Sequence, residues 1–585
     1  MNPRSIVTLP RVFYLLRYHR WRQFVLRFIR SWALPLQWKL FLLKLQRSPI
    51  PSFCSHISVR PIPLSSGTTS IPFPHYPKIQ IPFPELPEKA LSAPLLQFEI
   101  ESHSHIQNLK DTEKAWKIVV EWIQSNTQNK KSSYLTSWHP YVISKRIQNW
   151  LLLWSQSPPS QEIENTVLIS LWQQGLWLSN NFEKDIEGNH LCENAISLAL
   201  VGFFLKTPQS SAWWDQGLST LQYALSQQIL DSGEHFEKSP SYHWELWKTL
   251  QWLLNWVKPE YKEQLEKLTP YLNKMENFIT QIAHPCGTLP YFNDSWLIKV
   301  PPSTLNSNEW LGDYFITRNS SSFMVFDGGP LGPDFLPAHS HCDLLTFELS
   351  IGKKPLFINS GTHSYTGEKR QHFRSSKSHN VLTLNDYDCA DTWNSFRMGK
   401  RGHVIQKGDL SSASGRWVWA SHNGYRFLGC PSVTRLWFIS ESPHLWVSFH
   451  WISHFLEDHH FKEYLHFSPE TQLPNLTLKE NKKRFSFQHD LAFQCHFQSL
   501  LENQCLEFQT TSFAPSFYCE LPKTTAILNR TASKAPLHNQ IATAWALNVG
   551  KDSVKMSWAV INNKLKLSWV FDGKTFSSEI TIPSS

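Results

Sequence analysis

The sequence of 585 residues has no apolar run long enough to cross a membrane and no paired cysteine motif. A membrane-spanning helix needs about 20 predominantly apolar residues, and arginines interrupt every apolar run of the amino-terminal segment. The nine cysteines are scattered without a C-x-x-C pair, which suits neither a disulfide framework nor a zinc ribbon. The sequence therefore predicts a folded chain that depends on neither a membrane span nor cysteine chemistry.

Several large enzyme classes lack their signatures here. The sequence contains no serine nucleophile elbow, no phosphate-binding P-loop and no dinucleotide fingerprint. Nor does it offer an identifiable pair of carboxylates of the kind that glycoside hydrolases use. These absences argue against serine hydrolases, nucleotide-dependent enzymes and ordinary glycosidases.

Acidic residues are missing from the first 84 residues, which hold twelve Lys or Arg. The rest of the chain carries 44 Lys or Arg against 47 Asp or Glu, so the net charge of +9 belongs to this segment. No nucleic-acid-binding motif accompanies it, and no nucleic-acid partner is predicted.

Residues 1–47 form a basic amphipathic segment with helical spacing of Arg, Leu, Phe and Trp. Two alternatives stay open for it: an interfacial helix in peripheral contact with a membrane, or a helix packed on the main domain. No secretory signal is evident. We expect a cytoplasmic protein or one at the periphery of the inner membrane, with the cell envelope or periplasm as the alternative.

Three further segments follow along the chain. Residues 48–104 are Pro-rich and predict an extended linker. Residues 105–311 place apolar residues at three/four spacing, as in "ENAISLALVGFFLK", which predicts antiparallel helix pairs. Residues 312–585 read as strands broken by turn residues. Helices first and strands after indicate an α+β multidomain fold.

Polar side chains crowd in four places where the surrounding pattern predicts burial. These clusters are Asn189 and His190 in "EGNHLCENA", His235, Glu237, Tyr242 and His243 in "GEHFEKSPSYHWELW", His339, His341 and Asp343 in "AHSHCD", and Arg374, Lys377 and His379 in "FRSSKSHNV". Asn189 is also a natural helix N-cap. If "AHSHCD" is a strand, its three polar side chains share one face. That face could be a metal site, an acid/base site or a solvated strand surface.

Asn, Tyr, His and Arg together suit β-elimination on a uronic acid polymer. The C5 proton lies next to a carboxylate, so an enzyme must first neutralise that carboxylate, for which Asn and His are suitable donors. A base must then take the proton and an acid must protonate the leaving O4. A tyrosine near cationic groups can perform both steps, because such neighbours lower its pKa.

Five ordered motifs resemble the heparinase II/III family of polysaccharide lyases. They are "GNHLCENAISLALVGFF", "GEHFEKSPSYH", "GTLPYFNDS", "DGGPLGPDFLPAHSHCDLLTFELSIGKKPLFINSGTHSY" and "HFRSSKSHNVLTLND", within residues 185–390. The resemblance implies an incomplete (α/α) toroid followed by a large antiparallel β-sandwich. It implies that Asn189 neutralises the carboxylate with His190 beside it, that Tyr242 is the Brønsted acid and base, and that His339 assists. We expect Glu237, His243 and Arg374 to contact substrate.

The resemblance also implies one structural zinc ion, held by His341, His379 and the residue after "PLFI". That residue is usually Asp in the family but is Asn359 here. An amide oxygen is a poorer zinc ligand than a carboxylate, which disfavours the metal. Asp343 is expected to orient a neighbour or cap the strand.

The predicted function is a lyase acting on an acidic polysaccharide. A uronyl C5-epimerase is the nearest alternative, because it abstracts the same proton and returns one to the other face. A non-catalytic polysaccharide-binding or assembly factor for capsule or exopolysaccharide is the alternative from another class. A metal-dependent hydrolase is less favoured, since the acidic ligands for it are not obvious.

Overall fold

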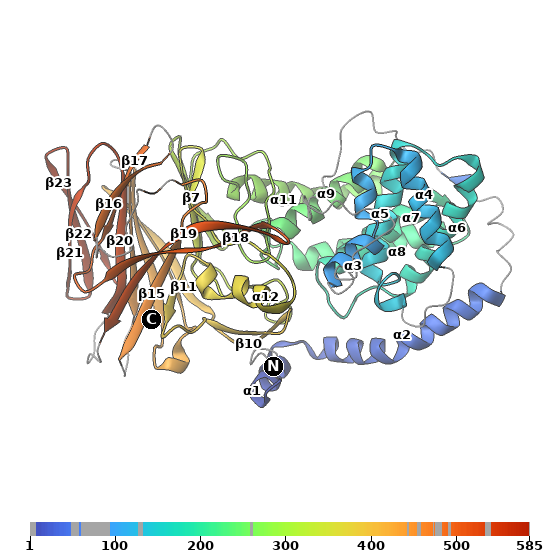
Figure 1. Ribbon diagram of the computed structural model, residues 1–585, viewed down its shortest axis with the longest axis horizontal. Coiled ribbons are helices and arrows are strands. Elements are labelled where there is room, and N and C mark those ends of the chain that lie inside the picture. Colours follow the sequence, from blue (N-terminus) through green and yellow to red (C-terminus); the bar gives the residue numbers. More distant parts are fainter. Residues whose placement is uncertain are drawn as a thin grey trace. The chain divides into compact units, whose positions relative to one another are not determined.

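The computed structural model describes residues 7–47, 58–59, 94–126, 133–257, 261–441, 444–452, 458–471, 473, 483–489, 493–532 and 540–583. Contacts divide the chain into two compact units. The helical unit comprises Tyr18–Phe236 and Tyr242–Asn277, and the strand unit comprises Met1–Arg17, Glu237–Ser241 and Phe278–Ser585. Figure 1 shows helices in the first and antiparallel sheets in the second, as the sequence predicts.

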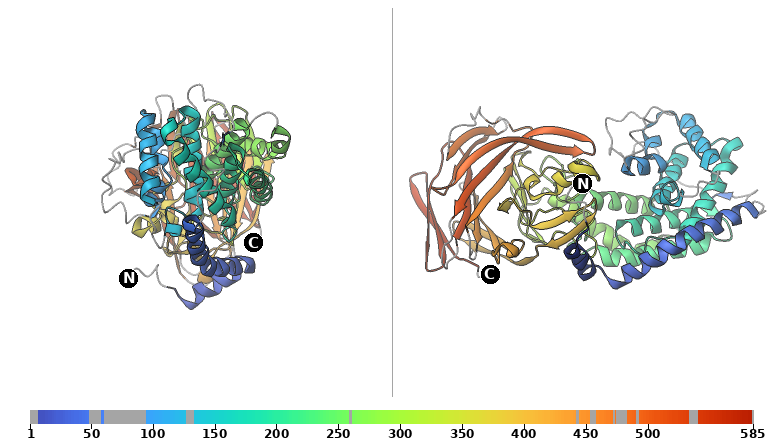
Figure 2. Two further views of the ribbon diagram at one scale, coloured as in Figure 1. Left: turned by 90° about the vertical axis from the view of Figure 1, so that its right-hand side faces the viewer. Right: turned by 60° about the horizontal axis from the view of Figure 1, so that its bottom comes forward.

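The helical unit is built from helices joined by short loops, several of which run side by side in the left view of Figure 2. Its elements are α2 (Trp21–Arg47), β1 (Ser58–Val59), α3 (Pro94–Glu101), η3 (Ser104–Asn108), α4 (Thr112–Asn126), η4 (Ser133–Leu135), α5 (Pro140–Gln156), α6 (Gln161–Asn180), α7 (Asn189–Phe204), β2 (Leu205–Lys206), α8 (Ser210–Gln228), α9 (Pro240–Trp256), α10 (Lys262–Glu266) and α11 (Thr269–Ile282). The first residues of α9 and the last of α11 fall in the strand unit.

Helix α7 lies at the centre of the helical unit, with nearly all of its residues buried. Its neighbour α8 approaches closely because glycines stand at the contact. A Cβ at Gly217 would lie 2.7 Å from both the Ala195 carbonyl oxygen and the Ala199 backbone nitrogen. A Cβ at Gly202 would lie 2.6 Å from the backbone nitrogen of Trp214. The α7–α8 spacing therefore requires residues without side chains.

The described residues of the strand unit form five antiparallel sheets, with strand orders β3-β4-β5-β6-β7, β11-β12-β13-β14-β20-β17-β16, β18-β19-β15-β8, β21-β22-β23 and β10-β9. Its elements are α1 (Leu9–Tyr18), β3 (Ser307–Leu311), β4 (Tyr314–Arg318), β5 (Ser322–Asp327), β6 (Phe347–Ile351), β7 (Lys354–Phe357), α12 (Gly367–Arg374), η6 (Ser376–Ser378), β8 (Leu382–Leu384), β9 (Ala390–Trp393), β10 (Arg397–Arg401), β11 (Val404–Ser412), β12 (Gly415–His422), η7 (Arg426–Leu428), β13 (Val433–Glu441), β14 (His444–Ile452), β15 (His459–His466), β16 (Arg484–His489), β17 (Phe493–Ser499), β18 (Cys505–Ser516), β19 (Cys519–Ala532), β20 (Gln540–Val549), β21 (Lys555–Ile561), β22 (Lys564–Phe571) and β23 (Lys574–Thr581).

The seven-stranded sheet is covered on both faces, as β13 illustrates. Successive side chains of a strand point to opposite faces. Trp437 packs in one apolar cluster with Phe347 of β6, whereas Phe438 packs in another with Trp569 of β22. Both faces are thus buried, which explains why β13 is apolar at consecutive positions instead of alternating.

Two sequence-based expectations differ from the structure. Residues 94–101, placed in the extended linker, form α3: a proline is well tolerated in the first turn of a helix, and Leu96 is buried. Contacts assign residues 278–311 to the strand unit, whereas the sequence division ran at 311/312. Most of the predicted 48–104 linker lies outside the described residues.

The "AHSHCD" segment is irregular and is not a strand, which corrects the predicted alternation. Regular pairing begins only at Phe347, with β6. Backbone groups before it bond outside any ladder: the His341 N–H donates to the Asn293 side-chain oxygen, and the Cys342 N–H to the Arg374 carbonyl. His339, His341 and Asp343 are therefore placed by these separate contacts.

Replacing Gly217 by Ala should lower the free energy of unfolding by about 1–3 kcal/mol, because the added methyl meets rigid backbone atoms of α7. Urea denaturation measures the change. Gly550→Ala is the matched control, since a Cβ there meets nothing within 4 Å. Equal stability of the two variants would contradict the close α7–α8 contact.

Candidate functional site

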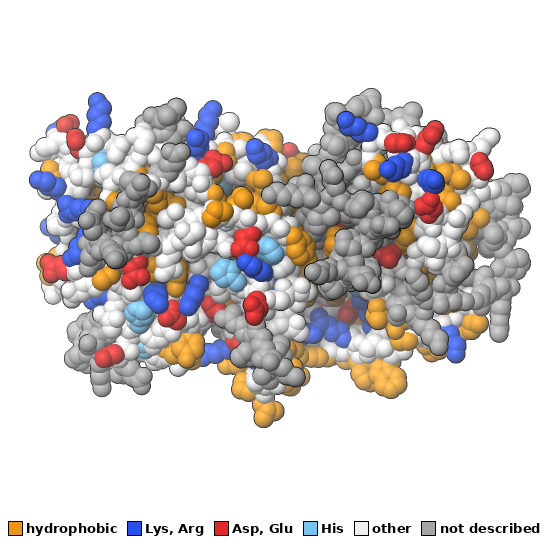
Figure 3. All heavy atoms as spheres, in the orientation of Figure 1, with side chains coloured by type: hydrophobic (Ala, Val, Ile, Leu, Met, Phe, Trp, Pro, Cys, Tyr) orange, Lys and Arg blue, Asp and Glu red, His pale blue; other side chains and the backbone are white. Residues whose placement is uncertain are grey.

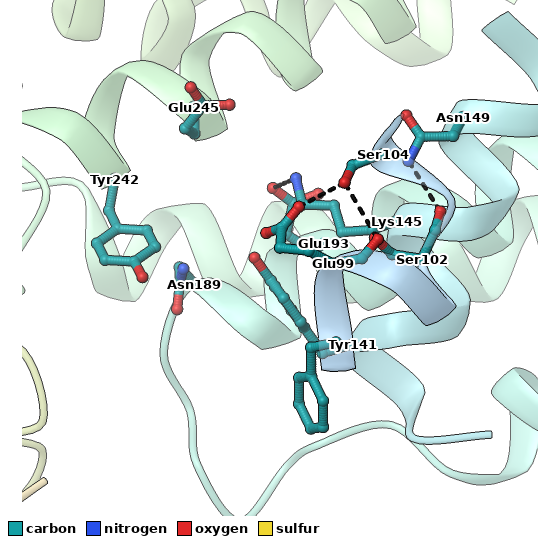
Figure 4. A pocket seen from close by; sticks show the side chains of 11 residues that line it. Glu99, Ser102, Ser104, Tyr141, Lys145, Asn149, Asn189, Glu193, Tyr242 and Glu245 are labelled. Carbon is teal, nitrogen blue, oxygen red and sulfur yellow. Dashed lines mark hydrogen bonds and ion pairs between the residues drawn. The ribbon is translucent and has the colours of Figure 1, made fainter. Parts of the chain in front are cut away.

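A pocket inside the helical unit brings together two of the predicted catalytic residues, Asn189 and Tyr242 (Figure 4). Helices α3, α5, α7 and α9 supply most of its walls. The remaining lining residues are Phe98, Glu99, Ser102, Ser104, Tyr141, Lys145, Asn149, Glu193 and Glu245.

Asn189 and Tyr242 both stand in the first turn of a helix. Gly188 occupies the N-cap position of α7, so Asn189 is not the capping residue that a sequence reading allows. Helix α9 begins at Pro240, two residues before Tyr242. The N-terminus of a helix carries partial positive charge, and at Asn189 that charge favours an anion.

The side chains around the pocket are acidic. Glu193 accepts hydrogen bonds from Lys145 Nζ and Gln148 Nε2, each at 2.6 Å. Glu99 accepts one from Ser104 Oγ at 2.6 Å, and Glu245 pairs with Lys248 at 3.0 Å. Lys145 is the one Lys or Arg among the pocket's lining residues.

This charge balance differs from the expected tyrosine among cations. Burial, followed by the neighbouring Tyr242 and then the carboxylates of the pocket, raises the pKa of the Tyr141 hydroxyl well above its usual value. Beside Tyr242 the pocket therefore offers mainly neutral hydrogen-bonding groups and the N-terminus of α7, with Lys145 already paired to Glu193.

His190 is not among the lining residues of the pocket, but it contacts Tyr141, which is. Its ring stacks on Tyr141 with centroids 4.1 Å apart, and its Nδ1 lies 3.0 Å from Glu183 Oε1. Although burial opposes it, the charges of His190 and His139 hold the pKa of Glu183 below its usual range. This contact orients His190 beside Tyr141.

In the strand unit, His339 is oriented by a buried carboxylate. Its Nδ1 lies 2.9 Å from Asp294 Oδ2, and its Nε2 lies 3.5 Å from Glu237 Oε2. Because a carboxylate accepts hydrogen bonds, Nδ1 carries a proton and Nε2 is the nitrogen that can exchange one. Glu237 is almost fully buried beside it.

Asp294 has three charged or ionisable partners. The Arg370 guanidinium forms a bidentate ion pair with it. His341 Nε2 lies 2.8 Å from its Oδ1, and His339 is the third partner. Burial opposes ionisation, but Arg370 first and then the two histidines hold the pKa of Asp294 well below its usual value.

Asn293 links two of the sequence motifs through the same turn. Its amide nitrogen donates to the Lys238 carbonyl at 3.0 Å, and its oxygen accepts from the His341 N–H at 2.8 Å. Asn293 and Asp294 belong to the quoted "GTLPYFNDS" motif, yet the sequence reading did not single them out. Arg370 was missed as well, although a buried carboxylate demands such a partner.

The predicted zinc ligands do not form a converging set. His341 Nδ1 faces His379 Nε2 at 3.1 Å, but Asn359 Oδ1 contacts the other nitrogen of His379, Nδ1, at 3.2 Å. Asn359 Oδ1 also accepts from Thr346 Oγ1 at 2.8 Å. Among the described residues, no group of three or more His, Cys, Asp or Glu is placed to hold a metal ion. This arrangement does not fit zinc.

Two of the residues predicted to contact substrate are buried and bonded to backbone groups. Arg374 is fully buried and donates to the carbonyl oxygens of Ser340 and Ser395, at 3.0 and 3.1 Å. His243 is also buried, between the Met275 carbonyl and the His235 N–H. Both side chains hold backbone segments in place.

Asp343 is buried close to Asp294, and burial raises its pKa to about 7. It does not cap a strand, because the segment around it is irregular. Its backbone oxygen accepts from the Thr346 N–H at 3.0 Å and closes the turn before β6.

Models of two domains match the chain: "Heparinase II/III N-terminus" at residues 106–321 and "Heparinase II/III-like, C-terminal" at residues 311–536. A heparin-sulfate lyase of Bacteroides stercoris is 25% identical over 306 residues, or 44% of this chain and 45% of that protein. A heparin-sulfate lyase of Pedobacter heparinus is 25% identical over 304 residues, with the same coverage. The match thus spans less than half of these curated relatives.

Solved structures share the fold. A crystal structure of heparinase III aligns with a TM-score of 0.68 at 16% identity, over 85% of each chain. A heparan sulfate lyase from Pedobacter heparinus aligns with a TM-score of 0.58 at 16% identity, over 84% of this chain and 82% of that one. The predicted fold class, a helical toroid followed by a β-sandwich, is confirmed.

Replacing Asp294 by Ala should lower the free energy of unfolding by about 3–5 kcal/mol, because Arg370 would stay buried without its partner. Urea denaturation of the full chain measures this loss. Asp409→Ala is the matched control: its pair with Arg416 is partly exposed, so the loss should be about 0–1 kcal/mol. Similar losses in both variants would contradict the role given to Asp294.

Proposed function

Because the chain belongs to the heparinase II/III-like proteins, we propose that it is a polysaccharide lyase acting on a polymer that contains uronic acid. The reaction is β-elimination: a base removes the C5 proton, the electron pair forms the C4–C5 double bond, the C4–O4 bond breaks, and O4 leaves with a proton. The products are a shortened chain and a chain with an unsaturated terminal sugar.

The observation that carries this proposal is the presence of Tyr242 and Asn189 in one pocket. Asn189 has an amide donor for the uronate carboxylate, and the N-terminus of α7 adds partial positive charge at the same place. Tyr242 supplies a hydroxyl that can take the C5 proton as phenolate and give a proton to O4 as phenol.

His339 is proposed to exchange or donate a proton through Nε2. Asp294 fixes the ring by accepting from Nδ1, in the way that a buried aspartate orients a catalytic histidine in acyl-transfer enzymes. Glu237 faces Nε2 and acts as a positioning residue in this proposal.

Tyr242→Phe should reduce lyase activity by about 10²–10⁴-fold, since it removes the proton-transferring hydroxyl and leaves the ring. Activity is followed by the ultraviolet absorbance of the unsaturated product on a panel of uronic acid polymers. Tyr223→Phe, at an exposed position of α8, is the control and should keep full activity.

Two outcomes would overturn the lyase proposal. Incorporation of solvent deuterium at C5 without chain cleavage would identify a uronyl epimerase. Binding of a polymer with neither cleavage nor exchange, unchanged in Tyr242→Phe, would identify a non-catalytic polysaccharide-binding factor.

We further expect unsulfated polymers to be preferred over sulfated ones. Glu99, Glu193 and Glu245 surround the pocket with one lining lysine. Glu193 is paired with Lys145 and Glu245 with Lys248. A sulfate about 6 Å from the Glu99 carboxylate costs about 3 kcal/mol at an effective dielectric constant of about 20, or about 100-fold in kcat/KM. A uronate polymer and its O-sulfated derivative are the matched substrates.

Glu99→Gln should narrow this preference, because it removes one charge and keeps an oxygen to accept from Ser104. If the sulfated polymer has an equal or higher kcat/KM while the unsulfated polymer is still cleaved, the expected selectivity is wrong. The lyase proposal itself would then still hold.

A further inference from the structure

Helix α2 exposes a continuous apolar stripe, defined here as Trp21, Val25, Phe28, Ile29, Trp32 and Leu36. These residues recur at intervals of three and four and therefore share one helical face. Trp21 and Trp32 are 76% and 73% exposed, and Phe28 is 66% exposed. Figure 3 shows hydrophobic side chains standing out where α2 runs in Figure 1.

The opposite side of α2 is fixed to the helical unit. Leu34, Trp38 and Phe41 are buried in its core, and the Trp38 ring lies 5.1 Å from that of Trp177. Arg30 forms an ion pair of 2.5 Å with Asp185. The stripe is thus held outward by a docked helix, and folding of the helical unit does not cover it.

The charge beside the stripe is positive. Residues 1–84 contain no Asp or Glu, and the nearby Glu187 is paired with Arg20 and Arg22. Arg22 is half exposed, and Lys39 is exposed on the same side of α2 as Trp21 and Trp32.

Exposed tryptophans with Arg and Lys beside an apolar helical face are typical of helices that lie in the interface of an anionic bilayer. None of the described helices is long and apolar enough to span a membrane. A second copy of this chain fits the stripe poorly, because it would bring two basic segments together without an acidic partner.

We propose that the apolar stripe of α2 lies in the interface of an anionic lipid bilayer, parallel to its plane. The apolar side chains enter the boundary between headgroups and acyl chains, while Lys39 contacts anionic headgroups. This proposal is independent of the lyase activity.

Co-sedimentation of the full chain with vesicles tests it. Binding is expected to vesicles of phosphatidylcholine mixed with phosphatidylglycerol, to be weak on phosphatidylcholine alone, and to fall as salt rises. The double variant Phe28→Glu, Trp32→Glu should bind at least about tenfold more weakly, since it removes two apolar anchors and adds like charge to the lipid.

The matched control is Val560→Glu, Ile561→Glu, which changes two exposed apolar residues of β21 in the strand unit. It should bind like the unaltered chain, and both variants should keep its melting temperature. Failure to bind the mixed vesicles, equal binding to both vesicle types, or unchanged binding by the α2 variant would overturn the proposal. The proposal would also be overturned if the unaltered chain and the control variant were dimers in solution and the α2 variant were a monomer.

Discussion

The conformation of the irregular segment that holds His339 and His341 depends on the ion pair and hydrogen bonds of the buried Asp294 carboxylate. An ionised carboxylate at this depth is tolerable only when its oxygens are fully paired. Arg370, His339 and His341 supply the partners, and they come from two segments well separated from Asp294 in sequence. An irregular loop thus gains a fixed geometry without belonging to a sheet, and the tautomer of His339 is set by the same contact.

In the helical unit, by contrast, carboxylates outnumber cations around the pocket. Stabilisation of a carboxylate-derived intermediate would therefore depend on aligned neutral donors. Preorganised donors are most effective where charge develops during reaction, because they bind the intermediate more strongly than the ground state. Asn189 at the start of α7 suits this role better than a lysine, which would hold an anionic polymer tightly before and after the reaction.

Much of the fold was readable from the sequence because periodicity reports burial directly. The order of helices and strands follows from it. The proximity of Asn189 and Tyr242 does not follow from periodicity and was predicted from the sequence motifs instead. The contacts of Asp294 could not be predicted, since Arg370 lies 76 positions away and a lone Asp in a turn carries no sign of its partner. The burial of Arg374 and His243 could not be predicted either. Their partners are backbone carbonyl groups, and a sequence does not show which carbonyl groups lie near a side chain.

The basic amino-terminal helix is packed on the helical unit through one face, and its other face carries the apolar stripe proposed to contact a membrane. Its inner face contacts the loop between α6 and α7: Arg30 pairs with Asp185, and Arg22 pairs with Glu187. That loop ends at Asn189, the first residue of α7. The helix that presents the apolar stripe is therefore bonded, through two ion pairs, to the segment that positions the proposed carboxylate-binding amide. If α2 moves, these ion pairs must break or the loop must move with the helix. The apolar stripe and Asn189 are therefore connected through this loop.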